Sequence, residues 1–133
     1  MKKKCINPIN LFDSRQYGFS QIVVSNPGKM VHISGQVAWD EHLNVIGEND
    51  LGQQMGKAME NLKTAIESVG GTLEHVVMLR IYKVNFKKED GPVISEILKK
   101  YFSASTLPAS TWLSVSGLAN EKFMIEIEAQ AVI

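Results

Sequence analysis

The strictest pattern in the chain lies near its C-terminus, where apolar and polar residues alternate through the stretch IEIEAQA. Positions 125, 127, 129 and 131 are apolar, and the positions between them carry two glutamates and a glutamine. A period of two is typical of a strand that turns one side to a core and the other to water. The chain is therefore expected to build a sheet with a covered face and an open face.

The other segments supply two helices and further strands for that sheet. Asp50, followed by Gln53, predicts the start of a helix that Gly70 ends, and Pro108 prevents a second helix from continuing. In order, we predict a hairpin over 20–38, a helix over 51–69, a strand over 75–85, a helix over 92–102 and strands over 112–116 and 125–131. With 133 residues, this order indicates one α+β domain, residues 1–133, in which two helices cover one face of a single sheet.

The open face of this sheet is expected to be more apolar than a face left in water. Trp112, Met124 and Val132, from the last two strands, would lie on it beside polar residues. An exposed apolar patch of this kind favours contact with another subunit. The alternative is that these are scattered surface hydrophobic residues, which are common singly.

Charge and cysteine content disfavour several classes of protein. Fourteen basic and fourteen acidic side chains cancel, so the positive field that supports nucleic-acid binding is missing. The lone Cys5 cannot form an intramolecular disulfide and has no Cys or His neighbour at zinc-ligand spacing, so we expect a reducing compartment and no metal site. The chain has no apolar run of membrane-spanning length, and its basic start lacks the apolar run of a signal peptide. We expect a cytoplasmic protein that does not bind membranes.

Four motifs, in this order, resemble the RidA/YjgF family across nearly the whole chain. They are SGQVA, ENLKTAIESVGGT, VVMLRIYKV and LPASTWLSVSGLANEKFMIEIEAQAV. The resemblance implies a chorismate mutase-like fold, in which a mixed sheet is backed by two helices and three copies pack into a barrel with clefts between subunits. It also implies hydrolysis of reactive enamines and imines, such as 2-aminoacrylate, to a 2-keto acid and ammonia without a metal or organic cofactor.

The segment PAST at residues 108–111 departs from the family at the residue that anchors the substrate. Active deaminases of the family read PARS here, and the arginine pairs with the substrate carboxylate through a planar fork. Ser110 offers one hydrogen bond and no charge. Phe19 stands where the family has a tyrosine that faces the cleft, and Trp112 stands where many deaminases have a small residue or a thiol. The resemblance therefore implies a more apolar cleft that lacks the carboxylate anchor.

Glu126 is the candidate for chemistry in that cleft. It matches the first glutamate of the family's EIEA motif, which lies where it can position water or relay a proton, and partial burial there would raise its pKa toward neutrality. Without the resemblance, it is better interpreted as a glutamate on a solvated sheet face. Ser34 and Gly35, from the SGQVA motif, are the further ligand-binding residues that the resemblance implies.

Arg80 is the one candidate for a replacement anchor. It shares a strand face with Met78 and Tyr82, so it could supply from a neighbouring strand the cation that Ser110 does not. The alternative is that it turns its head group to water or pairs with an acid, as strand arginines more often do. His32 alternates with apolar neighbours and is expected to be structural.

Three functions from different classes remain open. We favour a homotrimeric RidA-like protein of the arginine-lacking type, whose clefts bind or transform a small molecule other than a simple 2-imino acid, a less acidic or an aromatic one. The second is a true enamine or imine deaminase, a cofactor-free hydrolase that holds its substrate by another group such as Arg80. The third is a non-catalytic ligand-responsive regulator, or the RNA-cleaving translation inhibitor activity sometimes attributed to the family, which the neutral net charge disfavours.

Overall fold

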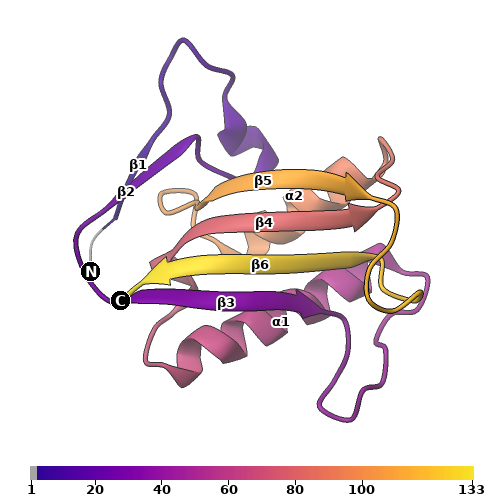
Figure 1. Ribbon diagram of the computed structural model, residues 1–133. Coiled ribbons are helices and arrows are strands. Elements are labelled where there is room, and N and C mark those ends of the chain that lie inside the picture. Colours follow the sequence, from indigo (N-terminus) through magenta and orange to yellow (C-terminus); the bar gives the residue numbers. More distant parts are fainter. Residues whose placement is uncertain (1–2) are drawn as a thin grey trace.

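A four-stranded mixed sheet forms the centre of the fold in the computed structural model, which describes residues 3–133 (Figure 1). Its strands lie in the order β3-β6-β4-β5. β4 and β5 are parallel, whereas β6 runs antiparallel to both of its neighbours. The strand bounds are Met30–Val37 for β3, Val76–Val84 for β4, Ala109–Val115 for β5 and Ile125–Val132 for β6. The strands predicted for the second half of the chain are confirmed, with small differences at their ends.

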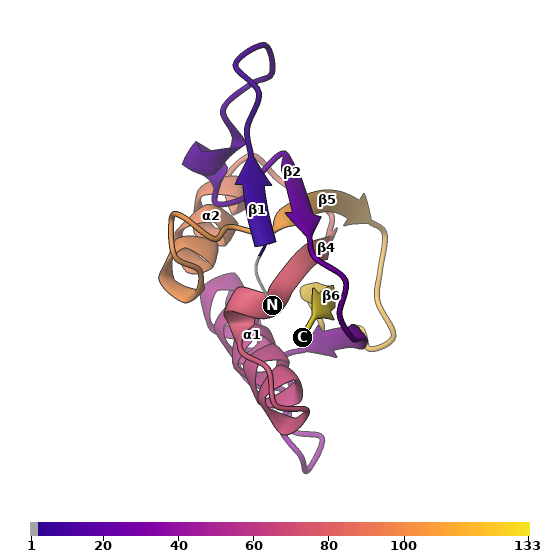
Figure 2. The same ribbon diagram turned by 90° about the vertical axis from the view of Figure 1, so that its left-hand side faces the viewer.

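Two helices, α1 (Leu51–Ser68) and α2 (Asp90–Tyr101), cover one face of this sheet (Figure 2). α1 begins where the sequence predicts it, because the side chain of Asp50 accepts a hydrogen bond of 3.0 Å from the backbone N–H of Gln53. The apolar sides of both helices pack on the covered face of the sheet. The largest side chains without exposed surface in this core include Met55, Met59, Leu62, Leu79, Ile94 and Ile127. The predicted α+β architecture, with two helices on one face of a mixed sheet, is confirmed.

The open face is less apolar than the sequence predicts, because the side chains of β5 point to the opposite faces from those predicted. Trp112 pairs in parallel register with the fully buried Ile81, so its ring lies on the helix side, where it packs against the core. Met124 also packs against the core, and Val132 is only 3% exposed. The prediction of an exposed patch of Trp112, Met124 and Val132 is therefore wrong. Leu113, which is 43% exposed, and the half-buried Val115 are the apolar residues that β5 turns to the open face.

The first strands pair differently from the predicted hairpin over 20–38. β2 (Ile22–Ser25) pairs antiparallel with β1 (Lys3–Ile6) in a separate two-stranded sheet, while β3 pairs with β6. The hairpin prediction is wrong because each of the two strands finds its partner elsewhere in the chain. Pairing with β6 brings β3 against α1, which buries apolar area that a local hairpin would leave exposed.

The segment between β1 and β2 projects beyond the main sheet and contains the short 3-10 helix η1 (Ser14–Tyr17) (Figure 1). We call residues 3–25 the N-terminal arm. Ser20 ties the arm to β5, because it bridges to Ala109 and its hydroxyl donates a hydrogen bond of 2.6 Å to the carbonyl of Leu107. Near the other end of the arm, the Lys3 ammonium donates to the carbonyl of Val76 at 2.6 Å, just after the short helix η2 (Leu73–His75).

No helix within residues 3–133 combines the length and the apolar composition that crossing a membrane requires.

Candidate functional site

Four polar side chains gather on the open face, where β4 and β6 lie side by side. Arg80 stands opposite Glu128, and Tyr82 stands opposite Glu126. Arg80 Nη1 lies 3.8 Å from Glu128 Oε1, and the Tyr82 hydroxyl donates a short hydrogen bond to the same oxygen. We call these four residues the open-face cluster. Their side chains meet because every second residue of a strand points to the same face.

Within this cluster, the carboxylate of Glu126 lies over Gly35 of β3. A Cβ atom at position 35 would overlap Glu126 Oε2, so glycine is the residue that leaves room for the carboxylate. Partial burial raises the pKa of Glu126, and the nearby charge of Glu128 raises it further. A raised pKa moves a carboxyl group toward the pH at which it can both accept and release a proton, which suits it to proton relay.

Tyr82 and Glu128 are members of the cluster that sequence reasoning did not predict as site residues. The hydrogen bond to Glu128 raises the pKa of Tyr82, so its hydroxyl stays protonated and keeps donating. The spacing of two residues from Arg80 places Tyr82 on the same strand face, and that signal was available in the sequence. The acceptor of the Tyr82 hydrogen bond could not be predicted from the sequence, because it depends on the register between β4 and β6.

A hollow of about 210 Å³, which we call the open-face hollow, borders the open-face cluster. Arg80 and Glu128 line it on one side, and Ser34 and His32 of β3 line it on the other. His32 Nδ1 lies 3.5 Å from Gln130 Nε2, and the histidine is exposed. The structure thus brings four of the predicted site residues together on one face: Ser34, Gly35, Arg80 and Glu126.

The other three predicted site residues, Phe19, Ser110 and Trp112, lie on the helix side of β5. The rings of Phe19 and Trp112 are 5.9 Å apart, and Ser110 pairs in register with the fully buried Leu79. Ser110 Oγ and Trp112 Nε1 are both buried, and neither has a hydrogen-bond partner in the part of the chain that the structure describes. The sheet separates these three residues from Glu126 within one chain.

A larger hollow, of about 580 Å³, opens beside Trp112 between η1 and α2. We call it the α2 hollow. Tyr17 and Trp112 line it from one side, and α2 lines it from the other, with Pro92, Ser95 and Lys99 among its residues. Its volume falls in the range that small-molecule sites in proteins occupy.

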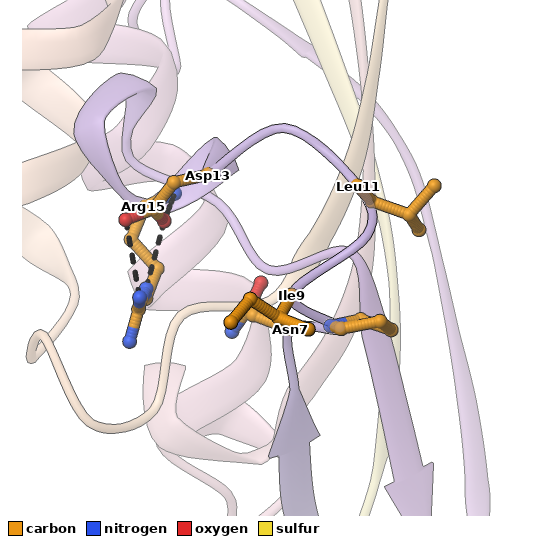
Figure 3. A pocket seen from close by; sticks show the side chains of 6 residues that line it. Asn7, Ile9, Leu11, Asp13 and Arg15 are labelled. Carbon is orange, nitrogen blue, oxygen red and sulfur yellow. Dashed lines mark hydrogen bonds and ion pairs between the residues drawn. The ribbon is translucent and has the colours of Figure 1, made fainter.

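A third hollow, of about 390 Å³, lies in the N-terminal arm (Figure 3). Its charged side chains pair with each other, because Arg15 donates to both carboxylate oxygens of Asp13 at 2.8 and 3.1 Å. Ile9, at the edge of this hollow, is 97% exposed. None of the predicted site residues lines it, so we do not place the functional site there.

Within residues 3–133, no three His, Cys, Asp or Glu side chains are grouped in a way that could hold a metal ion. Cys5 is a free thiol whose Sγ donates to the carbonyl of Leu107 at 3.3 Å. What the described residues offer is hydrogen-bond donors, one carboxyl group with a raised pKa and two hollows of different polarity.

Comparison with known proteins extends over most of the chain. The model of the family described as Endoribonuclease L-PSP matches residues 14–133. Protein DfrA of Myxococcus xanthus is 32% identical over 114 residues, which cover 86% of this chain and 84% of that protein. A RutC family protein of Pyrococcus abyssi is 30% identical over 104 residues, which cover 78% of this chain and 79% of that protein.

Solved structures extend the likeness to the fold. YyfB of Yersinia pestis, from the conserved Rid protein family, matches with a TM-score of 0.96 and 33% identity over 100% of both chains. RidA from an Antarctic Psychrobacter matches with a TM-score of 0.71 and 28% identity over 86% of this chain and 88% of that one. The chain therefore belongs to the RidA/YjgF family, which the Endoribonuclease L-PSP model describes and which the four sequence motifs predict.

Proposed function

We propose that this protein is a cytoplasmic, single-domain RidA-like homotrimer whose clefts between subunits bind a small metabolite, and that it is a poor 2-imino acid deaminase. This proposal rests on Ser110. Its hydroxyl is uncharged and buried, so it cannot replace the two charge-assisted hydrogen bonds of an arginine fork. Such bonds contribute about 1.5 to 3 kcal/mol each, so their loss would slow turnover on the order of a hundredfold or more.

The position of the cleft between subunits is supported by the separation of the predicted site residues. Glu126 and Gly35 lie on the open face of the sheet, whereas Phe19 and Trp112 lie on its helix side. A neighbouring subunit can bring its own open-face cluster to the β5 edge that carries the aromatic pair. One cleft would then contain a carboxyl group from one subunit and an apolar wall from the next.

The test is turnover of 2-iminopropionate, generated in the assay, by the native protein and by variants at position 110. We expect little or no keto acid from the native protein and measurable turnover from Ser110→Arg. Because the indole of Trp112 can stack on the new guanidinium, the double variant Ser110→Arg with Trp112→Cys should recover more activity. Thr111→Arg is the matched control, since it places an arginine one residue along on the opposite side of β5.

Two results contradict the proposal. Full activity of the native protein shows that Ser110 is no defect. A trimeric but inactive double variant shows that the missing arginine does not limit the reaction.

A deaminase anchored by Arg80 is the second candidate, because Arg80 lies on the same open face as Glu126 and lines the open-face hollow. Its pairing with Glu128 at 3.8 Å competes with a substrate carboxylate, so we rank this function second. If the native protein proves active, Arg80→Met should abolish the activity. Arg15→Met is the matched control, because Arg15 pairs with Asp13 on the exposed arm.

The description of the family as an endoribonuclease raises RNA as a substrate. Equal numbers of basic and acidic side chains give no net attraction to a polyanion, so we propose no nucleic-acid partner. Filter binding of single-stranded RNA across salt concentrations tests this, and tight binding at physiological salt would contradict it.

A further inference from the structure

We infer that the α2 hollow binds a planar aromatic monoanion. This inference rests on the proposed function, because Trp112 belongs both to the hollow and to the proposed cleft, and it names the class of ligand that the cleft takes. With a volume of about 580 Å³, the hollow is large enough for a fused aromatic ring system with a short acidic substituent. The open-face hollow, at about 210 Å³, is much smaller.

A series of aromatic rings leads from the surface of the N-terminal arm to this hollow. Ring centroids are 6.3 Å apart between Tyr17 and Phe12, 6.3 Å between Phe12 and Phe19, and 5.9 Å between Phe19 and Trp112. Phe86 follows at 6.4 Å from Trp112. The two residues of the series that line the hollow, Tyr17 and Trp112, give it aromatic side walls, against which a flat ring packs better than an aliphatic chain does.

The charged residues of the hollow favour an anion. Lys88 and Lys99 line it together with one acid, Glu96, which leaves one net positive charge. Neither lysine forms an ion pair with another residue of the described chain. A ligand with a single negative charge would therefore find a cation that has no competing partner, and both lysines come from the α2 side of the hollow rather than from β5.

This arrangement differs from a carboxylate clamp at position 110 in where it would hold the acid. Ser110 lies on β5 and does not line the hollow, whereas both lysines line it and are exposed. A ligand that reaches from Trp112 to the lysines has its ring inside and its acidic group at the rim. The buried Trp112 Nε1, which has no partner among the described residues, adds a donor that a polar atom on the inner ring could satisfy.

The experiment is isothermal titration calorimetry of the full chain with three probes. 2-Naphthoate is a planar aromatic anion, 2-naphthamide is its neutral analogue, and octanoate is an aliphatic anion. We expect 2-naphthoate to bind about fivefold or more tightly than each of the other two, because each of them lacks one of the two recognised features. Equal binding of the three probes, or no binding of 2-naphthoate at millimolar concentration, overturns the inference.

Variants locate the binding in the hollow. Lys88→Gln and Lys99→Gln should each weaken 2-naphthoate binding by up to about fivefold, the upper range for an exposed charge pair, and leave 2-naphthamide unaffected. Glu96→Gln should strengthen 2-naphthoate binding, because it removes the like charge. Lys100→Gln is the matched control on α2, since Lys100 does not line the hollow. Unchanged affinity in both lysine variants at positions 88 and 99 overturns the inference.

The aromatic wall is tested by Trp112→Leu, which should remove the preference for 2-naphthoate over octanoate. Tyr17→Ala alters the exposed side of the same wall and serves if Trp112→Leu does not fold. A preference that survives both changes overturns the inference. Its failure is distinguishable from failure of the proposed function: a trimer without deaminase activity that ignores 2-naphthoate contradicts only the ligand class, whereas efficient turnover of 2-iminopropionate contradicts the proposed function.

Discussion

At Glu126, burial and a neighbouring like charge act in the same direction. Both raise the pKa of its carboxyl group, and the backbone of Gly35 leaves no side chain to push the carboxylate away. Glu128, two residues along the same strand, has partners instead: Arg80 at 3.8 Å and the hydroxyl of Tyr82. The two glutamates share a strand face but differ in environment, so they should respond differently to substitution.

Glu126→Gln should therefore change stability in a pH-dependent way. A folded-state pKa above the unfolded one means that the charged carboxylate is disfavoured in the folded protein only. The cost is absent below the unfolded pKa of about 4.3 and fully present above the folded pKa. We expect Glu126→Gln to raise the free energy of unfolding at pH 7 and to leave it unchanged near pH 4, as measured by urea unfolding across that range.

Glu128→Gln is the matched comparison on the same strand. It loses the ion pair with Arg80 and weakens the acceptor for Tyr82, so it should lower the free energy of unfolding at pH 7. If both variants change the free energy of unfolding at pH 7 in the same direction, the claim that Glu126 and Glu128 have different environments is contradicted. A Glu126→Gln variant that is less stable at pH 7 would show that the carboxylate is held as a favourable anion.

At the scale of elements, the long connection between β5 and β6 is held on α1 by one buried side chain. Gln54, which has no exposed surface, accepts a hydrogen bond of 2.8 Å from the backbone N–H of Met124. Its amide nitrogen donates another, also of 2.8 Å, to the carbonyl of Lys122. Both backbone groups belong to the residues that lead into β6 and hence to Glu126, so Gln54 ties the start of that strand to α1.

Gln54→Leu should lower the free energy of unfolding by about 2 to 4 kcal/mol, because it leaves two backbone groups without their partners. Urea unfolding measures the loss, and hydrogen exchange at the Met124 amide should speed up. Lys63→Leu is the control on the same helix, since Lys63 is exposed and makes only a surface pair with Glu67 at 3.9 Å, so its loss should cost within about 0.5 kcal/mol. If both variants lose a similar amount of unfolding free energy, the two buried hydrogen bonds of Gln54 do not stabilise the protein beyond the effect of a surface substitution.

The elements that the sequence predicts well are those whose signals are local. The Asp50 cap fixes the start of α1 from residues within one turn, and the alternation of residues 125–131 defines β6. β1 and β2 have no such local signal. Their pairing depends on contact between separate segments of the chain, and no tight turn joins them directly. The residue types of Asn26, Pro27 and Gly28, between β2 and β3, favour a turn, but the two strands that flank them do not pair with each other.

For β5, the sequence predicts the strand but not which of its two faces is covered by the helices. The alternation of the predicted strand over 112–116 separates Trp112 from Leu113, and the structure places these two side chains on opposite sides. A period of two does not say which side is covered, and the parallel register with β4 decides that question. The large ring of Trp112 then packs on the core, while the smaller Leu113 is left 43% exposed.

At the scale of the whole molecule, the candidate site is divided by the sheet. The resemblance predicted Ser34, Gly35 and Glu126, the strand pattern added Arg80, and these four lie together on the open face. The resemblance also predicted Phe19, Ser110 and Trp112, and these three lie together on the other side. Within one folded chain the sheet keeps the two groups apart, so we expect that only contact between copies of the chain could join them.

A homotrimer is therefore the assembly that we expect in solution. Light scattering on the purified protein at micromolar concentration should give three times the chain mass of 14.8 kDa. The apolar residues still exposed on the open face, Met30 and Leu113, at 54% and 43%, are available for that contact. A mass of one chain would contradict both the trimer and the cleft between subunits, and a mass of two chains would contradict the family geometry alone.

The same assembly predicts which surfaces face each other across the cleft. In a Cys5→Ser background, Ser34→Cys marks the open-face hollow and Tyr17→Cys marks the α2 hollow. When the two single-cysteine proteins are unfolded, mixed and refolded together, a short bismaleimide should join one to the other, because the two marks come from different subunits of one trimer. Lys100→Cys in place of Tyr17→Cys is the control, since Lys100 is exposed on α2 outside the hollow. Equal cross-linking of the two pairs, or no cross-link between the Ser34→Cys and Tyr17→Cys proteins, would mean that the open-face cluster of one subunit does not meet the aromatic wall of the next.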